Sequence, residues 1–586
     1  MIKSEIPRRL RAVVRARESS LIVLAAIIGA ISGIVVVTMA TGVDLLHTLF
    51  FGLAPGERLS ELTLITPLRA LLIPCIGGLF FGLTAEAIVR RRSRREVDPI
   101  EANALHGGRM SLRGSLLVAA QTIWSSGVGA SVGLEAGYTQ LASGVASRLG
   151  QAFRLRRSDL RILVGCGAAG AIAGAFGTPL AGAFYAFELI IGSYTIVSLA
   201  PVGIAALLGY LVAKAITPTP IGIFAETMSV VAARDLLIAV ILGLLAAAFG
   251  ITLMRGIAIC ESLLVRTKIR PALGPALGGL IVGLLALISP QVMSSGHGAL
   301  HLASVLHRPF KELSIVFTLK AIASVVSIGT GYRGGMFFAS LLLGALGGQL
   351  LASGLEAVWT PTVPLDLNAY ATVGMAALSA SVIGGPFTMV FIALESTGDL
   401  WLTAAVLIAV IVSAQVTREM FGYSFATWRF HLRGETIRSA ADVGWMRDLR
   451  VRQMMRRDVP TASVDLLVPT FCHLFPLGSA KQVAALDEDG RYAGLVNVSE
   501  AHVMEDQTIP IGQLLHHAND MLLPEMNIKQ AIRVFDRAEA EALVVVNSHA
   551  ERRVIGLLTE AHALRRYTDA LELRQRDLSG EEQEFG

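Results

Sequence analysis

The sequence predicts a polytopic all-α membrane protein that ends in a soluble α/β tandem domain. Of its 586 residues, 53% are hydrophobic and only 16% are charged, whereas a soluble domain carries about 25% charged residues. Long apolar segments recur as far as residue 432 and then stop, and short strand and helix patterns replace them. The expected organisation is a cytoplasmic amphipathic segment 1–19, a transmembrane domain 20–432, a linker 433–448, two soluble halves 449–506 and 507–573, and a disordered tail 574–586.

Charge and cysteine content exclude several classes of protein. The net charge is +5, but the basic residues lie beside apolar segments or in the tail, as the positive-inside rule requires, so we expect no nucleic-acid partner. The four cysteines are far apart and show no CxxC spacing, which implies neither a metal site nor a disulfide framework. HExxH, Walker-type and GxSxG motifs with supporting context are absent from the sequence, so we expect no enzyme and no required cofactor.

The apolar segments predict both membrane spans and broken helices. Residues 21–43 and 68–89 read as long spans. Basic residues lie before the first span and, at 90–95, after the second, so we expect the start of the first span and the end of the second to face the cytoplasm. Residues 115–122 and 179–191 are too short to cross a core that needs about 20 residues, and such segments are tolerated where they line a cavity or are covered by protein. Longer apolar segments follow at 196–212, 236–253, 276–288, 315–328, 336–351 and 400–416.

The transmembrane domain also repeats itself. Residues 167–179 resemble residues 374–386, and the same offset pairs Phe184 with Phe391 and Glu188 with Glu395. Upstream, residues 133–137 (GLEAG) resemble residues 331–335 (GYRGG). Two similar halves with interrupted helices at matching positions indicate a transporter whose binding site lies between the repeats.

Glu135 is the candidate functional acid of this domain. It lies between Gly133 and Gly137 in a long apolar region, where an ionisable side chain is a functional-site hypothesis by default. The residues after it read as a helix, whose positive N-terminus attracts anions. One reading is therefore a site that exchanges a carboxylate for an anion. The other is a glutamate that caps its own helix.

The soluble part reads as a repeated α/β unit. A helix-like stretch at 466–475 precedes two strand-like segments, 482–486 and 492–497, which a turn at 487–490 connects. The same order returns as residues 511–515, a helix at 528–538, a strand at 542–547 and a strand at 554–559.

Taken together, these motifs resemble the CLC family of chloride channels and proton/chloride exchangers. Residues 133–137 followed by Gln140 resemble the family's G-R/K-E-G-P motif, residues 330–337 its G-x-F-x-P region, and residues 182–188 a further helix; Tyr423 falls where the family has its inner-gate tyrosine. The resemblance implies the CLC fold, with two inverted-topology repeats of broken helices. It further implies a homodimer in which each subunit carries chloride or another small anion.

Site residues follow from the same resemblance. Glu135 would be the external gate and a proton carrier. The anion would be held by backbone N–H groups and one hydroxyl, from Gly133, Ala136, Gly137, Met336, Phe337 and Tyr423. A tyrosine near a membrane surface can instead belong to an interfacial aromatic belt.

Several positions depart from the family pattern. Glu96 stands where the family's G-S-G-I-P serine is expected, and we expect Glu96 and Asp98 to pair with Arg94, Arg95 or another cation, or to face the cytoplasm. Arg333 aligns with Glu135 in the repeat, so the two would form a salt bridge across the pore, unless Arg333 snorkels to a membrane face. Leu189 replaces the internal proton-transfer glutamate of exchangers, while Glu188 matches a structural acid.

The soluble part resembles a cytoplasmic pair of CBS domains. Such pairs bind adenine nucleotides in the cleft between the repeats, and the ribose-binding endings correspond here to Asn497, Glu500, Thr559 and His562. A purely structural dimer module is the alternative.

The sequence therefore predicts transmembrane chloride transport that Glu135 gates, with proton coupling weak, altered or absent. A fully coupled proton/chloride antiporter and a CBS-based membrane sensor with vestigial conduction remain alternatives. The expected location is the bacterial inner membrane, in contact with lipid, with N- and C-termini in the cytoplasm.

Overall fold

The computed structural model divides the chain into a membrane unit, Met1–Asp442, and a soluble unit, Val443–Gly586. It describes residues 18–54, 56–91, 96–217, 233–267, 269–305, 308–358, 365–422, 424–425, 427–428, 450–504, 508–566 and 569. The boundary at residues 442 and 443 falls inside the expected linker 433–448. That linker, nearly all of the N-terminal segment 1–19, the tail 574–586, Arg94, Arg95 and Tyr423 lie outside the described residues.

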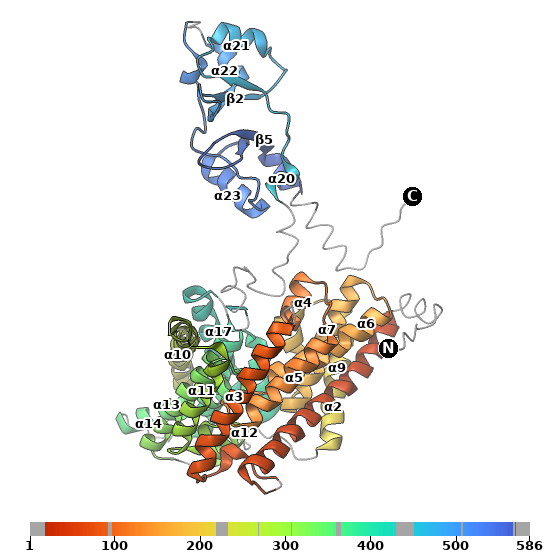
Figure 1. Ribbon diagram of the computed structural model, residues 1–586, viewed down its shortest axis with the longest axis vertical. Helices are drawn as coiled ribbons and strands as arrows, with labels where there is room; N and C mark the ends of the chain where they lie inside the picture. The colour runs from red at the N-terminus through yellow and green to blue at the C-terminus, as the bar shows by residue number, and fades with distance from the viewer. Residues whose placement is uncertain are drawn as a thin grey trace. The chain divides into compact units, whose positions relative to one another are not determined.

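The first half of the membrane unit consists of helices that differ widely in length. In chain order the elements are α2 (Glu18–Phe51), η1 (Leu59–Glu61), α3 (Pro67–Arg91), α4 (Pro99–Leu105), α5 (Leu112–Gly127), α6 (Glu135–Ala152), α7 (Arg157–Phe176), α8 (Pro179–Tyr185), the π-helical turn η2 (Ala186–Ile191) and α9 (Ile196–Ile216). Figure 1 shows α2, α5, α7 and α9 grouped together. The sequence did not single out α7 as a span, because glycine and alanine make up much of its length.

The second half repeats this arrangement. Its elements are α10 (Ala233–Arg266), η3 (Pro271–Leu273), α11 (Gly274–Ala286), η4 (Pro290–Val292), α12 (His297–Val305), α13 (Phe310–Gly329), α14 (Phe337–Val358), α15 (Leu367–Ile383), α16 (Pro386–Thr397) and α17 (Leu400–Met420). Helix α2 packs on α7 and α9, as α10 packs on α15 and α17. Helix α3 packs on its counterpart α11, and α8 on α16. Among the described residues, α2, α3, α7, α9, α10, α13, α14 and α17 are long and apolar enough to cross a membrane.

The predicted pairing of Glu188 with Glu395 is confirmed by reciprocal contacts. The Glu188 carboxylate accepts hydrogen bonds from the backbone N–H groups of Phe387 and Thr388, both at 2.9 Å. The Glu395 carboxylate accepts from the N–H groups of Leu180 at 2.8 Å and Ala181 at 2.9 Å. Each repeat therefore supplies the acid that caps a helix of the other repeat.

The local sequence explains why α8 and α16 begin where they do. Gly177 and Gly384 end the preceding helices with φ values of +71° and +86°, which glycine adopts without a steric penalty. Pro179 and Pro386 then occupy the first turn, where a missing N–H costs nothing. The Phe184 and Phe391 rings stack with centroids 4.3 Å apart, so the predicted offset holds throughout this segment.

The upstream alignment of residues 133–137 with 331–335 is wrong by four residues. Gly133 forms an antiparallel bridge with Gly335, in which Gly133 N donates to Gly335 O at 2.9 Å and Gly335 N to Gly133 O at 3.1 Å. The helices that follow begin at Glu135 and Phe337. Phe337, rather than Arg333, is therefore the counterpart of Glu135, and several glycines in each segment made the register ambiguous.

Serine contacts support the corrected register. Ser131 N donates to Ser327 Oγ at 2.9 Å, and Arg333 N donates to Ser125 Oγ at 3.2 Å. The two bonds are equivalent when Ser125 corresponds to Ser327 and Ser131 to Arg333. Arg333 thus belongs to the loop that crosses toward the other repeat.

The soluble unit contains the predicted tandem α/β repeat. The first half has α20 (Val451–Met454), β1 (Thr461–Ser463), α21 (Val468–Leu474), β2 (Gln482–Leu486), β3 (Tyr492–Asn497) and α22 (Val498–Val503), and the second has η5 (Ile511–Gln513), α23 (Ile528–Ala538), β4 (Ala542–Val546) and β5 (Val554–Thr559). Strand β2 pairs with β1 in parallel and with β3 in antiparallel, and β4 pairs with β5 in antiparallel. The predictions of β2, β3, β5 and α23 are confirmed at their bounds, and those of β4 and α21 are confirmed within two residues at each end. The expected segment 511–515 begins with η5, whereas β1 and α22 were missed.

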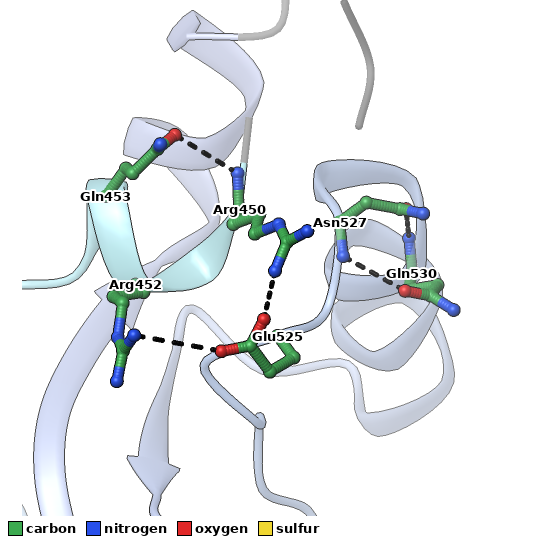
Figure 2. Close-up of polar contacts among 6 residues, drawn as sticks. All are labelled: Arg450, Arg452, Gln453, Glu525, Asn527 and Gln530. Atoms are coloured by element: carbon green, nitrogen blue, oxygen red, sulfur yellow. Dashed lines mark hydrogen bonds and ion pairs between the residues drawn. The ribbon is translucent and has the colours of Figure 1, made fainter. Parts of the chain in front are cut away.

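The start of the soluble unit is fastened to its second half. Val451 N donates to Met526 O at 2.9 Å and Arg452 N to Pro524 O at 3.1 Å. Figure 2 shows Glu525 forming ion pairs with Arg450 and Arg452 beside the Asn527–Gln530 capping box of α23. The first turn therefore packs against the repeat that lies later in the chain.

Candidate anion-binding site

Glu135 lies where the two repeats meet. It is the first residue of α6 and is 5% exposed. Its Oε1 accepts a hydrogen bond from Phe337 N at 2.5 Å, and its buried Oε2 has no hydrogen-bond partner among the described residues. The carboxylate therefore caps a helix, as one of the two sequence readings required, but the helix is α14 of the other repeat rather than its own.

Two glycines leave the space for this carboxylate. A Cβ added to Gly335 would lie 2.5 Å from Glu135 Oε1, and one added to Gly133 would lie 1.9 Å from Glu135 Oε2. Both distances are shorter than a carbon–oxygen contact permits, so only glycine fits at these two positions with the carboxylate in place.

Helix ends provide the electrostatic environment of the site. Glu135 lies at the N-terminus of α6 and against the N-terminus of the 22-residue α14. Because helix N-termini carry partial positive charge and free N–H groups, this position suits an anion. The Glu135 carboxylate occupies it in the structure, as a tethered anion would.

The expected backbone donors divide into two groups. Phe337 N–H points at the carboxylate, and Met336 and Phe337 are each 1% exposed. Gly133 N–H is engaged with Gly335 O, and Gly137 N–H donates to Leu134 O at 2.9 Å. Gly133 and Gly137 therefore shape the site in this conformation without offering free donors, and Ala136 lies between them in the first turn of α6.

Two tyrosines that the sequence reading missed lie beside Glu135. Tyr138 is 2% exposed, and its hydroxyl has no hydrogen-bond partner among the described residues. Its hydroxyl and that of Tyr185 on α8 interact electrostatically with Glu135. The available signal was the position of Tyr138, one helical turn after Glu135.

Comparison with known proteins identifies the family. The family model described as voltage gated chloride channel matches residues 77–418, which is more than half of the chain. This chain belongs to the CLC family.

Relatives and solved structures agree with this assignment. The chain is 29% identical over 405 residues to the voltage-gated ClC-type chloride channel ClcB of Escherichia coli strain UMN026, covering 68% of this chain and 96% of that protein. It is 31% identical over 334 residues to a putative chloride channel protein ClcB-like of Ralstonia nicotianae, covering 56% and 77% of the two chains.

Two solved structures show the same fold. A slow cyanobacterial Cl⁻/H⁺ antiporter has a TM-score of 0.61 at 20% identity and covers 70% of this chain and 97% of its own. A eukaryotic CLC transporter has a TM-score of 0.58 at 18% identity and covers 94% of this chain and 98% of its own. The fold prediction, a CLC membrane domain followed by an α/β tandem, is thereby confirmed.

The acids that replace the usual CLC serine segment have structural partners. The Asp98 carboxylate accepts from Glu101 N at 2.9 Å and caps α4. Glu96 packs on α5, since a Cβ added to Gly114 would lie 1.6 Å from Glu96 Oε2. The expected partners Arg94 and Arg95 lie outside the described residues, so that pairing remains a prediction, whereas the capping role of Asp98 was not foreseen.

In place of the expected salt bridge with Arg333, Glu135 contacts a backbone N–H group, that of Phe337. Arg333 is exposed, while Glu135 is buried against Phe337 N–H. Leu189 is 6% exposed within η2, and a leucine side chain cannot relay a proton. Glu188 serves as the cap of α16, consistent with a structural acid.

Three of the four candidate nucleotide side chains, those of Asn497, Glu500 and Thr559, already have polar partners inside the soluble unit. Glu500 Oε2 lies 2.6 Å from His516 Nε2, and Asn497 Oδ1 accepts from Gln482 Nε2 at 3.0 Å. Thr559 Oγ1 accepts from His562 N at 3.3 Å. These contacts connect the end of β3 to the start of β2, α22 to His516, and the end of β5 to the residues after it.

Proposed function

We propose that this CLC chain carries chloride across the membrane along a path that Glu135 gates, with proton coupling weak, altered or absent. The observation that carries the proposal is the contact of the Glu135 carboxylate with Phe337 N–H at the start of α14. Chloride competes for this donor, because a weakly hydrated anion is held by partial dipoles without being trapped. Protonation of Glu135 removes its charge and frees the donor for chloride.

Leu189 supports the second part of the proposal. An exchanger needs a chain of groups that bring protons to the gate from the opposite side, and Leu189 interrupts such a chain. The buried Tyr138 hydroxyl supports the competing proposal of a fully coupled antiporter, since a hydroxyl beside Glu135 can pass a proton. The two proposals differ in whether a chloride gradient drives protons uphill.

Reconstitution into liposomes tests both proposals. Chloride efflux and proton uptake are measured together for the full chain, for Glu135→Gln and for the matched control Glu86→Gln, whose acid lies near the far end of α3. At neutral pH we expect faster efflux in Glu135→Gln than in the parent chain, and little proton movement in the parent chain. Uphill proton movement in the parent would establish the antiporter. Equal flux in the parent and Glu135→Gln would reject the gate and favour the sensor.

We infer further that the protein is a homodimer. Helices α8 and α16 have 7 and 12 residues and pack on each other, yet Leu180 and Phe387 on them are 49% and 48% exposed. Helices this short cannot span the lipid and are stable at membrane depth when protein covers them. A second copy of the chain would cover this face.

Orientation and ligand binding complete the proposal. Arg90 and Arg91 end α3, which supports cytoplasmic N- and C-termini in a bacterial inner membrane.

Binding of an adenine nucleotide at the soluble unit remains a proposal, and the contact of Glu500 with His516 supports the alternative of a purely structural module. Measuring the melting temperature of the full chain at increasing ATP concentration distinguishes nucleotide binding from the structural alternative, because a ligand that binds the folded state raises the melting temperature.

A further inference from the structure

The membrane unit contains a polar cavity beside the gate. Its volume is about 120 Å³, and it lies between the C-terminal part of α2, the η1 turn, the end of α5, the loop before α6 and the entry to α12. Leu134, the residue before Glu135, is one of its walls. The cavity lies at the end of α2 that faces away from the Arg90–Arg91 end of α3, so the positive-inside rule places it on the outer side.

Hydrogen-bonding groups line this cavity. Four serines contribute, and two of them, Ser126 and Ser294, approach each other with Oγ atoms 3.0 Å apart. His47 Nε2 lies 3.1 Å from Ser126 O, so this nitrogen donates and Nδ1 is left to accept a proton. His297 Nδ1 is hydrogen-bonded to Ser295 Oγ.

His297 connects the cavity to the gate. Its ring centroid lies 3.3 Å from that of Phe338, which stacks on Phe176 at 4.5 Å, and Phe176 contacts Phe337 at 4.6 Å. Phe337 N–H holds Glu135. A continuous set of packed rings therefore joins His297 to the residue whose N–H contacts Glu135.

The charges around the cavity favour an anion. Lys320 of α13 is 0% exposed, and its Nζ donates to two neutral carbonyls, Val292 O at 3.1 Å and Ser294 O at 2.9 Å. Its amine therefore stands behind the Ser294–His297 wall without a carboxylate partner among the described residues. Arg58 adds a cation to the lining, and Asp44 is the one carboxylate there; Glu61 lies behind the wall, against Gly298.

We propose that this cavity is an outer anion site that binds one small inorganic anion together with a proton on His297 or His47. Its volume accommodates an anion with a few waters, each of which takes about 30 Å³. That the anion is chloride rests on the proposed function.

The proton and the anion assist each other at this site. Burial lowers the pKa of His297 most, and the nearby Arg58 and Lys320 lower it further. A bound anion offsets their charge, so it favours the protonated imidazole, and by linkage the proton raises anion affinity by the same factor. Lower pH on the outer side therefore strengthens anion binding.

Transport in the Glu135→Gln chain tests this proposal, since the gate itself no longer titrates there. Chloride flux is measured against outer chloride concentration in phosphatidylethanolamine/phosphatidylglycerol vesicles. We expect the half-saturating concentration to be about tenfold lower at pH about 5.5 than at pH about 7.5, because a bound anion raises the pKa of His297 back toward the range of an ordinary histidine. His297→Phe, which retains a ring against Phe338, should reduce this ratio to about threefold or less. His301→Gln on the same helix, outside the cavity lining, is the control.

A second variant and a direct probe keep the test decisive. Arg58→Gln should raise the half-saturating concentration at both pH values. Crystals of the full chain in bromide should show anomalous density in the cavity at low pH. An unchanged pH ratio in His297→Phe, or a cavity without bromide, overturns the site. Bromide in the cavity of a chain that carries no chloride would retain the site and reject the proposed function instead.

Discussion

At the scale of single residues, the site depends on what Gly133 and Gly335 lack. Their bridge joins the two repeats, and the absent side chains leave the volume that the Glu135 carboxylate fills. A tethered carboxylate held by backbone N–H groups is easier to displace than one held by a cation, because partial dipoles attract it less strongly than a full charge does. The contact with Phe337 N–H in place of the expected Arg333 therefore favours the gating role that we propose for Glu135.

Gly335→Ala tests this view of the gate. The added methyl group would lie 2.5 Å from Glu135 Oε1 and should push the carboxylate off Phe337 N–H. Chloride efflux at neutral pH should then rise toward that of Glu135→Gln. Gly203→Ala on α9, where a Cβ meets nothing within 4 Å, is the control. Efflux equal to the parent's in Gly335→Ala would contradict the steric account.

At the scale of elements, the two repeats are joined by reciprocal caps. Each short helix, α8 or α16, begins at a proline and takes its capping acid from the other repeat. Four backbone donors at membrane depth are satisfied in this way, and leaving such donors unpaired costs about 1–3 kcal/mol each.

Glu188→Ala and Glu395→Ala should therefore destabilise the protein by similar amounts, about 1–3 kcal/mol each. The double variant should lose less than the sum, because the two caps share one interface. Thermal unfolding in detergent measures this, with the exposed Glu419→Ala on α17 as control. A large loss for one acid and none for its counterpart would show that the caps are not equivalent.

The soluble unit allows a comparison of two polar contacts that lie side by side (Figure 2). Asn527 caps α23 within a capping box, and its removal costs about 1 kcal/mol. Glu525 pairs with Arg450 while both are more than half exposed, and such pairs are worth about 0–1 kcal/mol. Hydrogen exchange of residues 528–538 in the full chain should accelerate more in Asn527→Ala than in Glu525→Ala. The reverse order would assign the stability of α23 to the ion pair.

At the scale of the whole molecule, a second copy would cover the exposed side of α8, α9 and α16. Leu199 on α9 is 61% exposed and Leu263 on α10 is 53% exposed. Leu199→Trp should disturb a dimer interface and weaken the dimerisation constant about tenfold, which corresponds to about 1.4 kcal/mol, and so lower the dimer fraction. Leu263→Trp should leave the dimer fraction unchanged. Single-molecule photobleaching counts the copies, and equal effects of both variants would place the interface elsewhere.

Much of this architecture was readable from the sequence, and the reasons are local. Gly177, Pro179, Gly384 and Pro386 punctuate α8 and α16 so sharply that only one offset aligns them, which also paired Glu188 with Glu395 correctly. Strands β2 and β3 flank a turn that ends in Gly490 with φ +74°, so their bounds were clear. Three-residue β1 is too short to show an alternating pattern.

Long-range features could not be read in this way. At the observed offset, the glycines at 127, 129 and 133 align with those at 329, 331 and 335, whereas the predicted offset aligned 133 and 137 with 331 and 335. Both offsets pair glycines, so the five-residue motif alone did not decide between them. The contact of Glu135 with Phe337 joins residues 202 positions apart. The outer cavity likewise brings His47 together with His297, and nothing in either segment indicates the other.

The reciprocal caps also constrain how the chain assembles in the membrane. Until the second repeat is inserted, Glu188 lies at membrane depth without the N–H groups it binds, and α8 lacks the acid that closes its first turn. Arrival of α16 supplies both partners at once. The first repeat alone therefore lacks these contacts, much as complementary fragments stabilise each other only after they meet.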